Sequence, residues 1–391
     1  EMGLRFHGPS PEPPNRVPRM HNVIPGARAY IGALQDRLQT CGGRVVCDAD
    51  VVQILRDKQG VTGVVALIDG HEQNLLARRG VVMAAGDYTN SADLISRFKG
   101  ERFSGVEGIN PRSTGHGHTL CEQAGAQLLN MDITYGPELR FVAPEGRGSL
   151  QKMIPSRGPL ASLVGKLVPL VPDRLMARFV RRLLVTWQHP EDALLEDGAI
   201  LLNEDGERFC DERLSPEREI AIAAQPGKRC FLLLDEALIS RYSAWPHFIS
   251  TAPRIAYAYV DDYLRLRPDV AVAGRLEEVT DRRGLPSAAV RAVIDAVNVE
   301  RGDVGVLPHL AGKRWALLGP AKAYFTTTEG GVAIDQEFRA LDVAGDPIRG
   351  LYAIGQNGLG GQILWGHGLH IAWAMTSGRL VGRQLAQDAC A

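Results

Sequence analysis

The chain has 391 residues, of which 45% are hydrophobic and 23% are charged, and its formal net charge is −1. This length favours two domains over one, and the near-zero net charge gives no reason to expect a nucleic-acid partner. Six cysteines occur without a Cys-x-x-Cys pair or a histidine at metal-ligand spacing, which favours reduced thiols of a cytoplasmic protein over a zinc site or a disulfide framework.

The first part of the chain has the pattern of an α/β fold. A proline-rich loop over 9–18 precedes apolar residues at helical spacing over 29–38, which Gly42-Gly43 ends. Three strands are predicted after this helix, at 44–55, 63–68 and 80–86. The first six residues have neither a basic leader nor an apolar core, and we find no segment that predicts a membrane-spanning helix.

The middle of the chain differs from both ends. Residues 115–127 predict a glycine-led helix with a small-residue face. Short strands, helices and turns then alternate until about residue 325, and glycine-rich α/β character returns after it. We therefore predict a first α/β part at 1–131, an inserted domain at 132–325 and a final α/β part at 326–391.

A basic amphipathic stretch lies within the predicted inserted domain. Over 159–187, apolar residues recur at helical spacing, with arginines between them at 174, 178, 181 and 182. Two interpretations stay open: a surface helix with a solvated basic face, or a peripheral contact with an anionic membrane surface.

Three motifs occur in a fixed order. The first is a strand that ends in Ala-Ala-Gly-Asp-Tyr-Thr-Asn at residue 90, and the second is Gly-Ala-Ile-Leu-Leu-Asn-Glu-Asp-Gly-Glu-Arg-Phe at 198–209. The third begins with Leu-Tyr-Ala-Ile-Gly-Gln at 351–356 and closes with Thr-Ser-Gly-Arg at 376–379. Together they resemble the FAD-binding superfamily of fumarate reductases, succinate dehydrogenase flavoproteins and 3-ketosteroid dehydrogenases.

The resemblance implies a Rossmann-like FAD-binding domain, incomplete at its N-terminus, that is interrupted by an α+β capping domain at 132–325. The family opens with a strand, a G-x-G-x-x-G turn and an acidic residue for the ribose, and nothing before residue 30 matches this unit. We therefore expect the natural chain to begin earlier. The implied cofactor is FAD, and metal ligands are not expected.

The resemblance also implies where the flavin lies. A strand that ends in small residues lets a cofactor approach bare backbone, and a glycine-led helix start directs free N–H groups and a positive dipole end to it. Such donors favour the reduced cofactor. The implied FAD-binding residues are Val51, Ala84, Ala85, Gly86, Asn90, Gly355, Gln356, Gly368, Leu369, His370 and Ile371.

Three residues are candidates for proton transfer. Arg218 lies closest to the family's proton-donating arginine, offset by one or two positions because Pro216 and Glu217 occupy the expected place; a solvated arginine is the alternative. Tyr324, at the return from the inserted domain, is either catalytic or a core tyrosine. His367, beside the predicted helix start, either polarises a carbonyl or has a structural role.

The substrate-binding residues differ from those of fumarate reductases. Thr326–Thr328 replaces the family's histidines, and Trp365 replaces its clamp arginine, so a small anionic substrate would stay largely unpaired. Trp365 and Thr327 instead favour an apolar or aromatic substrate.

We thus predict an FAD-dependent oxidoreductase that desaturates or reduces a C–C bond next to a carbonyl by hydride transfer at flavin N5. The predicted substrate is an apolar, ketosteroid-like cyclic ketone, and an electron donor or acceptor that the sequence does not identify completes the reaction. Two alternatives stay open: a fumarate-reductase-like enzyme acting on a carboxylic acid, and a non-catalytic binding protein on a decayed flavoprotein fold.

Overall fold

The computed structural model describes residues 2–12, 15–24, 26–144, 163, 166–167, 171–252, 255–302, 306–366 and 368–387. The chain forms two compact units. Unit 1 contains residues 1–44 and 139–323, and unit 2 contains residues 45–138 and 324–391. The assignment of a capping domain to 132–325 stays a prediction.

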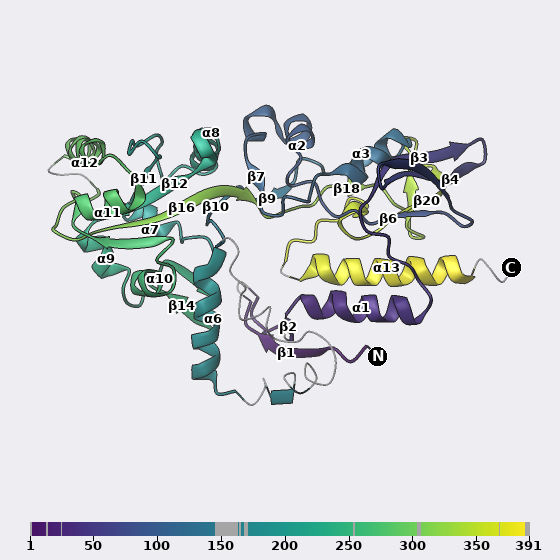
Figure 1. The fold of residues 1–391 in the computed structure, drawn as a ribbon, viewed down its shortest axis with the longest axis horizontal. Coiled ribbons are helices and arrows are strands. Elements are labelled where there is room, and N and C mark those ends of the chain that lie inside the picture. The colour runs from purple at the N-terminus through teal and green to yellow at the C-terminus, as the bar shows by residue number, and fades with distance from the viewer. Residues whose placement is uncertain are drawn as a thin grey trace. The chain divides into compact units, whose positions relative to one another are not determined.

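Unit 2 is built on a sheet in which β20 (Pro347–Ala353) lies between β19 (Arg339–Leu341) and β6 (Val81–Met83). β20 runs antiparallel to β19 and parallel to β6, with Ala353 opposite Met83. In Figure 1 the yellow helix α13 (Leu369–Gln387) runs along this sheet. Its residues Trp373, Val381 and Leu385 pack against Tyr352 and Phe338, and this contact fixes the helix on the sheet.

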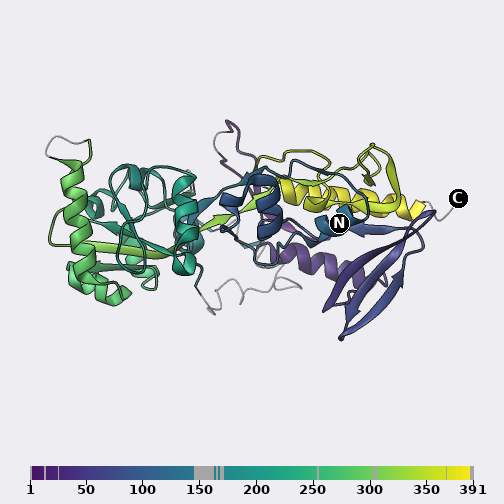
Figure 2. The same cartoon turned by 90° about the horizontal axis from the view of Figure 1, so that it is seen from above.

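A second, antiparallel sheet in unit 2 contains β3 (Ala49–Asp57), β4 (Gly60–Ile68) and β5 (His71–Leu76), drawn in blue in Figure 2. Ile54 and Val61 from this sheet pack with Met83, Leu120 and Leu351 in one core cluster. Burial of each such side chain stabilises the fold by roughly 1.5–3 kcal/mol, so this cluster joins the two sheets of the unit.

Short elements complete unit 2. α2 (Ala92–Lys99) begins at Ser91, whose side chain accepts from the backbone N–H of Leu94, and α3 (His116–Gln123) begins after Gly115 at φ 72°. The 3-10 turn η1 spans Glu101–Phe103 and η4 spans Gly355–Asn357. Two strand pairs are short: β8 (Leu128–Leu129) with β18 (Gly331–Val332), and β9 (Thr134–Tyr135) with β17 (Thr327–Thr328).

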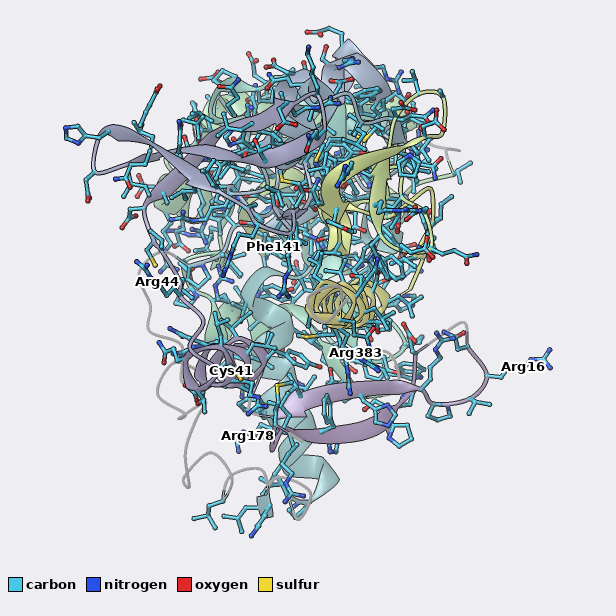
Figure 3. The ribbon with its side chains drawn as sticks, turned by 90° about the vertical axis from the view of Figure 1, so that its right-hand side faces the viewer. Arg16, Cys41, Arg44, Phe141, Arg178 and Arg383 are labelled. Carbon is cyan, nitrogen blue, oxygen red and sulfur yellow. The ribbon has the colours of Figure 1, made fainter. Side chains whose placement is uncertain are left out.

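Unit 1 is built on the sheet β10 (Glu138–Phe141)–β16 (Trp315–Phe325)–β12 (Cys230–Leu234)–β11 (Ile200–Leu202), and β15 (Ala271–Gly274) also pairs with β16. All five residues of β12 are buried, as expected for a strand covered on both faces. Phe141, labelled in Figure 3, is almost fully buried, and the centroids of its ring and the Tyr263 ring lie 5.0 Å apart. The last two residues of β16 pair in unit 2 with β7 (Glu107–Gly108).

Unit 1 also contains helices and short strands. The helices are α1 (Arg28–Thr40), α6 (Asp173–Trp187), α7 (Ala193–Glu196), α8 (Glu217–Ala224), α9 (Glu236–Arg241), α10 (Val260–Leu266), α11 (Leu276–Arg283) and α12 (Ser287–Arg301), with the 3-10 turn η3 (Pro226–Lys228). The pairs β1 (Arg5–Ser10) with β2 (Met20–Ile24) and β13 (Ser250–Ala252) with β14 (Ala256–Ala258) are antiparallel. Within the described ranges, no helix is both long and apolar enough to cross a bilayer.

The observed elements correct several predicted bounds. The strand predicted at 44–55 begins at Ala49, because Asp48 has a positive φ of 53° that interrupts extended backbone. The strand predicted at 80–86 ends at Met83, before Gly86 at φ 80°. β1 and β2 were not predicted beside the proline-rich loop, because few of their side chains are buried and no apolar alternation marks them.

Candidate functional site

The candidate site lies in unit 2, where β6 and β20 end together. Parallel strands present their carboxyl ends at one sheet edge. Pairing continues one residue past β20, since the N–H of Ile354 donates to the carbonyl of Met83 over 3.0 Å. The predicted residues Ala84–Gly86 and Gly355–Gln356 follow directly, so the structure brings these two segments to the same edge.

This edge fits a flat cofactor that lies against backbone. Ala84 and Ala85 are exposed. Gly86 and Gly368 both have φ 80°, and a Cβ at either position would meet nothing within 4 Å. α13 begins directly after Gly368, so the N–H groups of its first turn lack carbonyl partners within the helix. Open space beside bare backbone and a helix start is what the predicted FAD site requires.

Side chains of α13 hold the turn that follows β20. The N–H of Gly355 donates to Ser377 Oγ at 3.1 Å, and Ser377 Oγ donates to the carbonyl of Trp373 at 2.7 Å. Trp373 Nε1 donates to the carbonyls of Gly355 and Gly358 at 3.1 and 3.2 Å. These bonds fix the sheet edge relative to the start of α13.

A chain of polar side chains lies behind this edge. Gln356 Nε2 donates to Thr327 Oγ1, and the Thr327 side chain also bonds to the buried carboxyl of Asp87. Burial raises the pKa of Asp87, while hydrogen bonds from Ser113, Thr89 and Thr327 lower it in part. Thr327 Oγ1 thus accepts from Gln356 and donates its own proton to Asp87. We therefore interpret Thr327 as a residue that positions Gln356.

Two aromatic rings form an exposed face near this chain. Trp365 stacks on Tyr135 with ring centroids 4.1 Å apart and an interplanar angle of 23°. Tyr135 is the strand partner of Thr327. Trp365 remains 63% exposed, so most of this large apolar side chain is available to a ligand.

A buried carboxylate holds the first turn of α13. Glu329 is fully buried, and its Oε2 lies 3.2 Å from His370 Nε2. The same oxygen accepts from the N–H of Leu364 at 2.8 Å. A carboxylate oxygen accepts, so this contact requires a proton on Nε2 of His370. Glu329 Oε1 is buried without a hydrogen-bond partner in the described part of the chain.

Two of the other predicted cofactor residues, Val51 and Asn90, have structural contacts. Val51 is half-buried on β3 and packs against the core cluster of unit 2. Asn90 accepts from the N–H of Gly108 at 3.0 Å and donates to the carbonyl of Pro111 at 3.2 Å. Leu369 and Ile371 lie in the first turn of α13, where Ile371 is exposed.

The three catalytic candidates have different positions. Tyr324 lies in unit 2 at the end of β16, opposite Glu107 of β7, and His367 lies outside the described residues. Arg218 belongs to unit 1 and is 4% exposed, so the interpretation as a solvated arginine is wrong. The fold can bury this charged side chain because two carboxylates accept from it. Glu219 lies 2.7 Å from Nε, and Asp192 lies 2.9 Å from Nη2.

Sequence reasoning assigned no role to three residues of this site, Asp87, Tyr135 and Glu329. An acid directly after a strand that ends in glycine was a usable signal for Asp87, because polar groups at that edge meet ligands in α/β sheets. The stacking of Tyr135 and the contact of Glu329 with His370 depend on pairing between distant segments, and no local pattern reports this.

Comparison with known proteins defines the class of fold. The structure is similar to the open conformation of a flavocytochrome c3 fumarate reductase, with a TM-score of 0.65 at 19% identity, and the match covers 99% of this chain and 60% of that one. At this identity the likeness concerns the fold. It confirms the predicted α/β architecture with a Rossmann-like FAD-binding domain and an inserted α+β domain.

A family model described as "FAD binding domain" matches residues 9–141 and 173–363, and the chain belongs to this family. The match confirms the cofactor predicted from the sequence, FAD.

Two relatives of the chain carry the names of redox enzymes. The chain is 24% identical over 356 residues to NADH:acrylate oxidoreductase of Vibrio harveyi, which covers 86% of this chain and 30% of the relative. It is 24% identical over 422 residues to 3-oxosteroid 1-dehydrogenase of Mycobacterium tuberculosis, which covers 94% and 64%. The chain spans less than two thirds of either relative. Both relatives are oxidoreductases by name.

Proposed function

We propose that this chain belongs to an FAD-dependent oxidoreductase that desaturates or reduces a C–C bond next to a carbonyl in an apolar cyclic ketone. One observation carries the choice of substrate: the stacked pair of Trp365 and Tyr135, in which Trp365 is 63% exposed and Tyr135 is the strand partner of Thr327. A dicarboxylate-binding site needs cations at such positions, whereas two stacked rings bind a flat apolar ring.

The residues that would hold the cofactor are those of the open sheet edge. Ala84, Ala85 and Gly86 would contact it through backbone and methyl groups, and the first turn of α13, after Gly368, would donate N–H groups to it. Bound FAD supplies the hydride acceptor or donor.

The aromatic pair would bind the ring of the substrate and exclude water. Burial of an apolar ring against Trp365 contributes about 1–3 kcal/mol to binding. Tyr135 supports the Trp365 ring from behind and fixes its plane, which reduces the entropy lost when a substrate binds. Water exclusion strengthens the remaining polar contacts of the site.

His370 is the group in unit 2 that would accept or hold a proton. Its Nε2 is occupied by Glu329, so exchange with a substrate would use Nδ1. Glu329 acts as a positioning residue, because it sets the tautomer and the ring orientation of His370. Asp87, whose pKa is raised by burial, is a second group that can carry a proton near Thr327.

The competing proposal is reduction of an unsaturated carboxylate, as the name of the acrylate-reducing relative suggests. It would need a cation such as Arg218. However, Arg218 donates from Nε to Glu219, from Nη1 to the carbonyl of Glu212 and from Nη2 to Asp192. A carboxylate substrate would have to replace one of these partners, which favours the ketone.

We also propose a cytoplasmic protein with a peripheral membrane contact through 159–187, of which 159–162, 164–165 and 168–170 lie outside the described residues. Within this range α6 exposes Leu175, Phe179 and Arg178. Of these three, Figure 3 labels Arg178. Exposed apolar side chains beside arginine suit an anionic lipid surface. The test is sedimentation with anionic and neutral vesicles. Binding to anionic vesicles alone, lost in Phe179→Glu, supports the contact, and equal recovery in both supernatants contradicts it.

Dye-coupled turnover tests the proposed reaction. We expect the flavin-loaded protein to transfer electrons from saturated 3-oxosteroids or substituted cyclohexanones to an artificial acceptor, and not from succinate. A reduced viologen should likewise be oxidised by cyclic enones and not by fumarate. Turnover with succinate or fumarate alone would overturn the ketone proposal in favour of the carboxylate.

A further inference from the structure

Three arginines line one open pocket in unit 1. The pocket has a volume of about 470 Å³ and is formed by β15, by the segment before it, by the end of α11 and by the residue that precedes β16. Its cationic residues are Arg282, Arg283 and Arg314, and its apolar residues include Leu264 and Val272. All of these residues belong to unit 1.

The antiparallel pairing of β15 and β16 explains how distant arginines meet here. Gly274, at the end of β15, lies opposite Trp315, at the start of β16, so Arg314 lies beside the end of β15. The chain then continues from β15 into α11, whose last two residues are Arg282 and Arg283. Arg283 and Arg314 are 31 residues apart in the sequence, yet both line the same pocket.

None of these arginines forms a close ion pair with a carboxylate in the described part of the chain. The neighbouring acids bond to other arginines: Asp269 to Arg267, Glu278 to Arg275, Glu277 to Arg291 and Asp262 to Arg265. Arg282 and Arg314 are exposed. A cluster of like charges whose neighbouring acids are paired elsewhere repels itself and attracts anions.

Arg283 is anchored and incompletely satisfied. Its Nη1 donates to the carbonyl of Asp269 at 2.7 Å and its Nη2 to the carbonyl of Pro268 at 3.3 Å, while its Nε is buried without a hydrogen-bond partner in the described residues. Burial lowers the pKa of this guanidinium, and the nearby charge of Arg282 lowers it further, against the attraction of Asp269. A bound anion would remove this repulsion.

Helix stabilisation accounts for only part of this arrangement. Arginines in the last turn of a helix interact favourably with its negative dipole end, and this explains Arg282 and Arg283. It does not explain Arg314, which lies outside α11. Convergence of a third cation from another element on the same pocket indicates an anion site.

We propose that this pocket binds an organic phosphate with an apolar or aromatic body. A phosphate carries up to two charges and three acceptor oxygens, which suits several guanidinium groups better than one carboxylate does. The wall formed by Leu264, Pro268, Ala271 and Val272 gives the body of the ligand an apolar surface. This site is separate from the proposed flavin chemistry, and its test does not depend on turnover.

Isothermal titration of the 391-residue chain with phenyl phosphate tests the site. We expect one saturable site, with binding about tenfold weaker in Arg314→Gln and in Arg282→Gln. The matched control is Arg291→Gln, which removes the same charge from an exposed arginine outside the pocket. It should bind phenyl phosphate within about twofold of the unmodified chain.

Two further ligands separate the contributions of charge and body. Benzoate and inorganic phosphate should each bind at least several-fold more weakly than phenyl phosphate, because one lacks the second charge and the other lacks the ring. Absence of saturable binding by phenyl phosphate overturns the proposal. Equal binding of phenyl phosphate and inorganic phosphate, or equal weakening in all three arginine variants, overturns it as well. Unchanged circular dichroism of the variants shows that they remain folded.

Discussion

Glu329 Oε2 and His370 Nε2 lie 3.2 Å apart, although 41 residues separate them in the chain. One residue follows the short strand β17, and the other lies in the first turn of α13. Because the carboxylate is fully buried and accepts at this distance, it fixes the tautomer of a histidine beside the open sheet edge.

The first prediction concerns this pair. In Glu329→Gln the charge-assisted hydrogen bond to His370 is lost, which should lower the free energy of unfolding by about 1.5–3 kcal/mol. Nitrogen NMR of the histidine rings should show the Nε2–H tautomer of His370 in the unmodified chain and a mixture in the variant.

Glu337→Gln is the control for this substitution, because Glu337 is an exposed acid of the same unit that lies 3.4 Å from Arg339. Its effect on unfolding should stay within about 0.5 kcal/mol. A His370 signal of the Nδ1–H form in the unmodified chain, or no change in Glu329→Gln, would contradict the assigned role of Glu329.

The second prediction concerns the sheet edge that we propose as the FAD site, and it uses a substitution that does not strain the backbone. Ala84 is exposed, so Ala84→Leu should leave thermal stability nearly unchanged. If the cofactor lies against this strand end, the added side chain costs about 1–3 kcal/mol of overpacking in the complex, or roughly fivefold to 150-fold in FAD affinity. Ala344→Leu, at an exposed turn of the same unit, should keep normal flavin content; equal flavin content in both variants contradicts the proposed edge.

The third prediction concerns the aromatic face. Trp365→Ala should weaken binding of cyclic ketones about tenfold, because it removes one wall of the ring-binding face. Trp245→Ala is matched to it, since Trp245 is also 63% exposed and belongs to an aromatic cluster of unit 1. KM values for one ketone should rise only in Trp365→Ala. A similar rise in both variants, or in neither, argues against the role of Trp365.

The fourth prediction is a pH dependence of stability. His118 is fully buried, and burial lowers its pKa from 6.5 to about 4. Between these values the unfolded chain binds a proton that the folded chain does not, so the free energy of unfolding falls as the pH is lowered through this window. At pH 4 this histidine alone should lower the free energy of unfolding by about 3 kcal/mol relative to neutral pH.

Chemical denaturation at a series of pH values measures this dependence. His118→Leu should show a smaller loss below pH 6.5 than the unmodified chain, whatever its absolute stability. His71→Gln, on the exposed strand β5, should keep the original slope. A slope unchanged in His118→Leu would show that His118 titrates normally in the folded chain.

The elements that have an apolar pattern of their own were the ones predicted from the sequence. The apolar run before Gly86 marked β6, and the apolar repeat of 29–38 marked α1. β1 and β2 escaped prediction because they pair mainly with each other and bury little apolar surface. Their exposed side chains show neither helical spacing nor alternation.

The candidate site was predicted in part. Thr327, Gln356, Trp365 and His370 came from motif positions, and the structure brings all four into unit 2. The partners that orient them, Asp87, Tyr135 and Glu329, contact them across long sequence separations. Such pairing results from the fold as a whole, so a pattern of neighbouring residues cannot report it.

The central claim is that a flavin bound at this site exchanges hydride with an apolar cyclic ketone. Anaerobic titration of the flavin-loaded protein with a saturated 3-oxosteroid, followed by the visible absorbance of the flavin, tests it most directly. We expect that absorbance is lost with the steroid and retained with succinate, and that Trp365→Ala needs about tenfold more steroid. Loss of absorbance with succinate and none with cyclic ketones would contradict it.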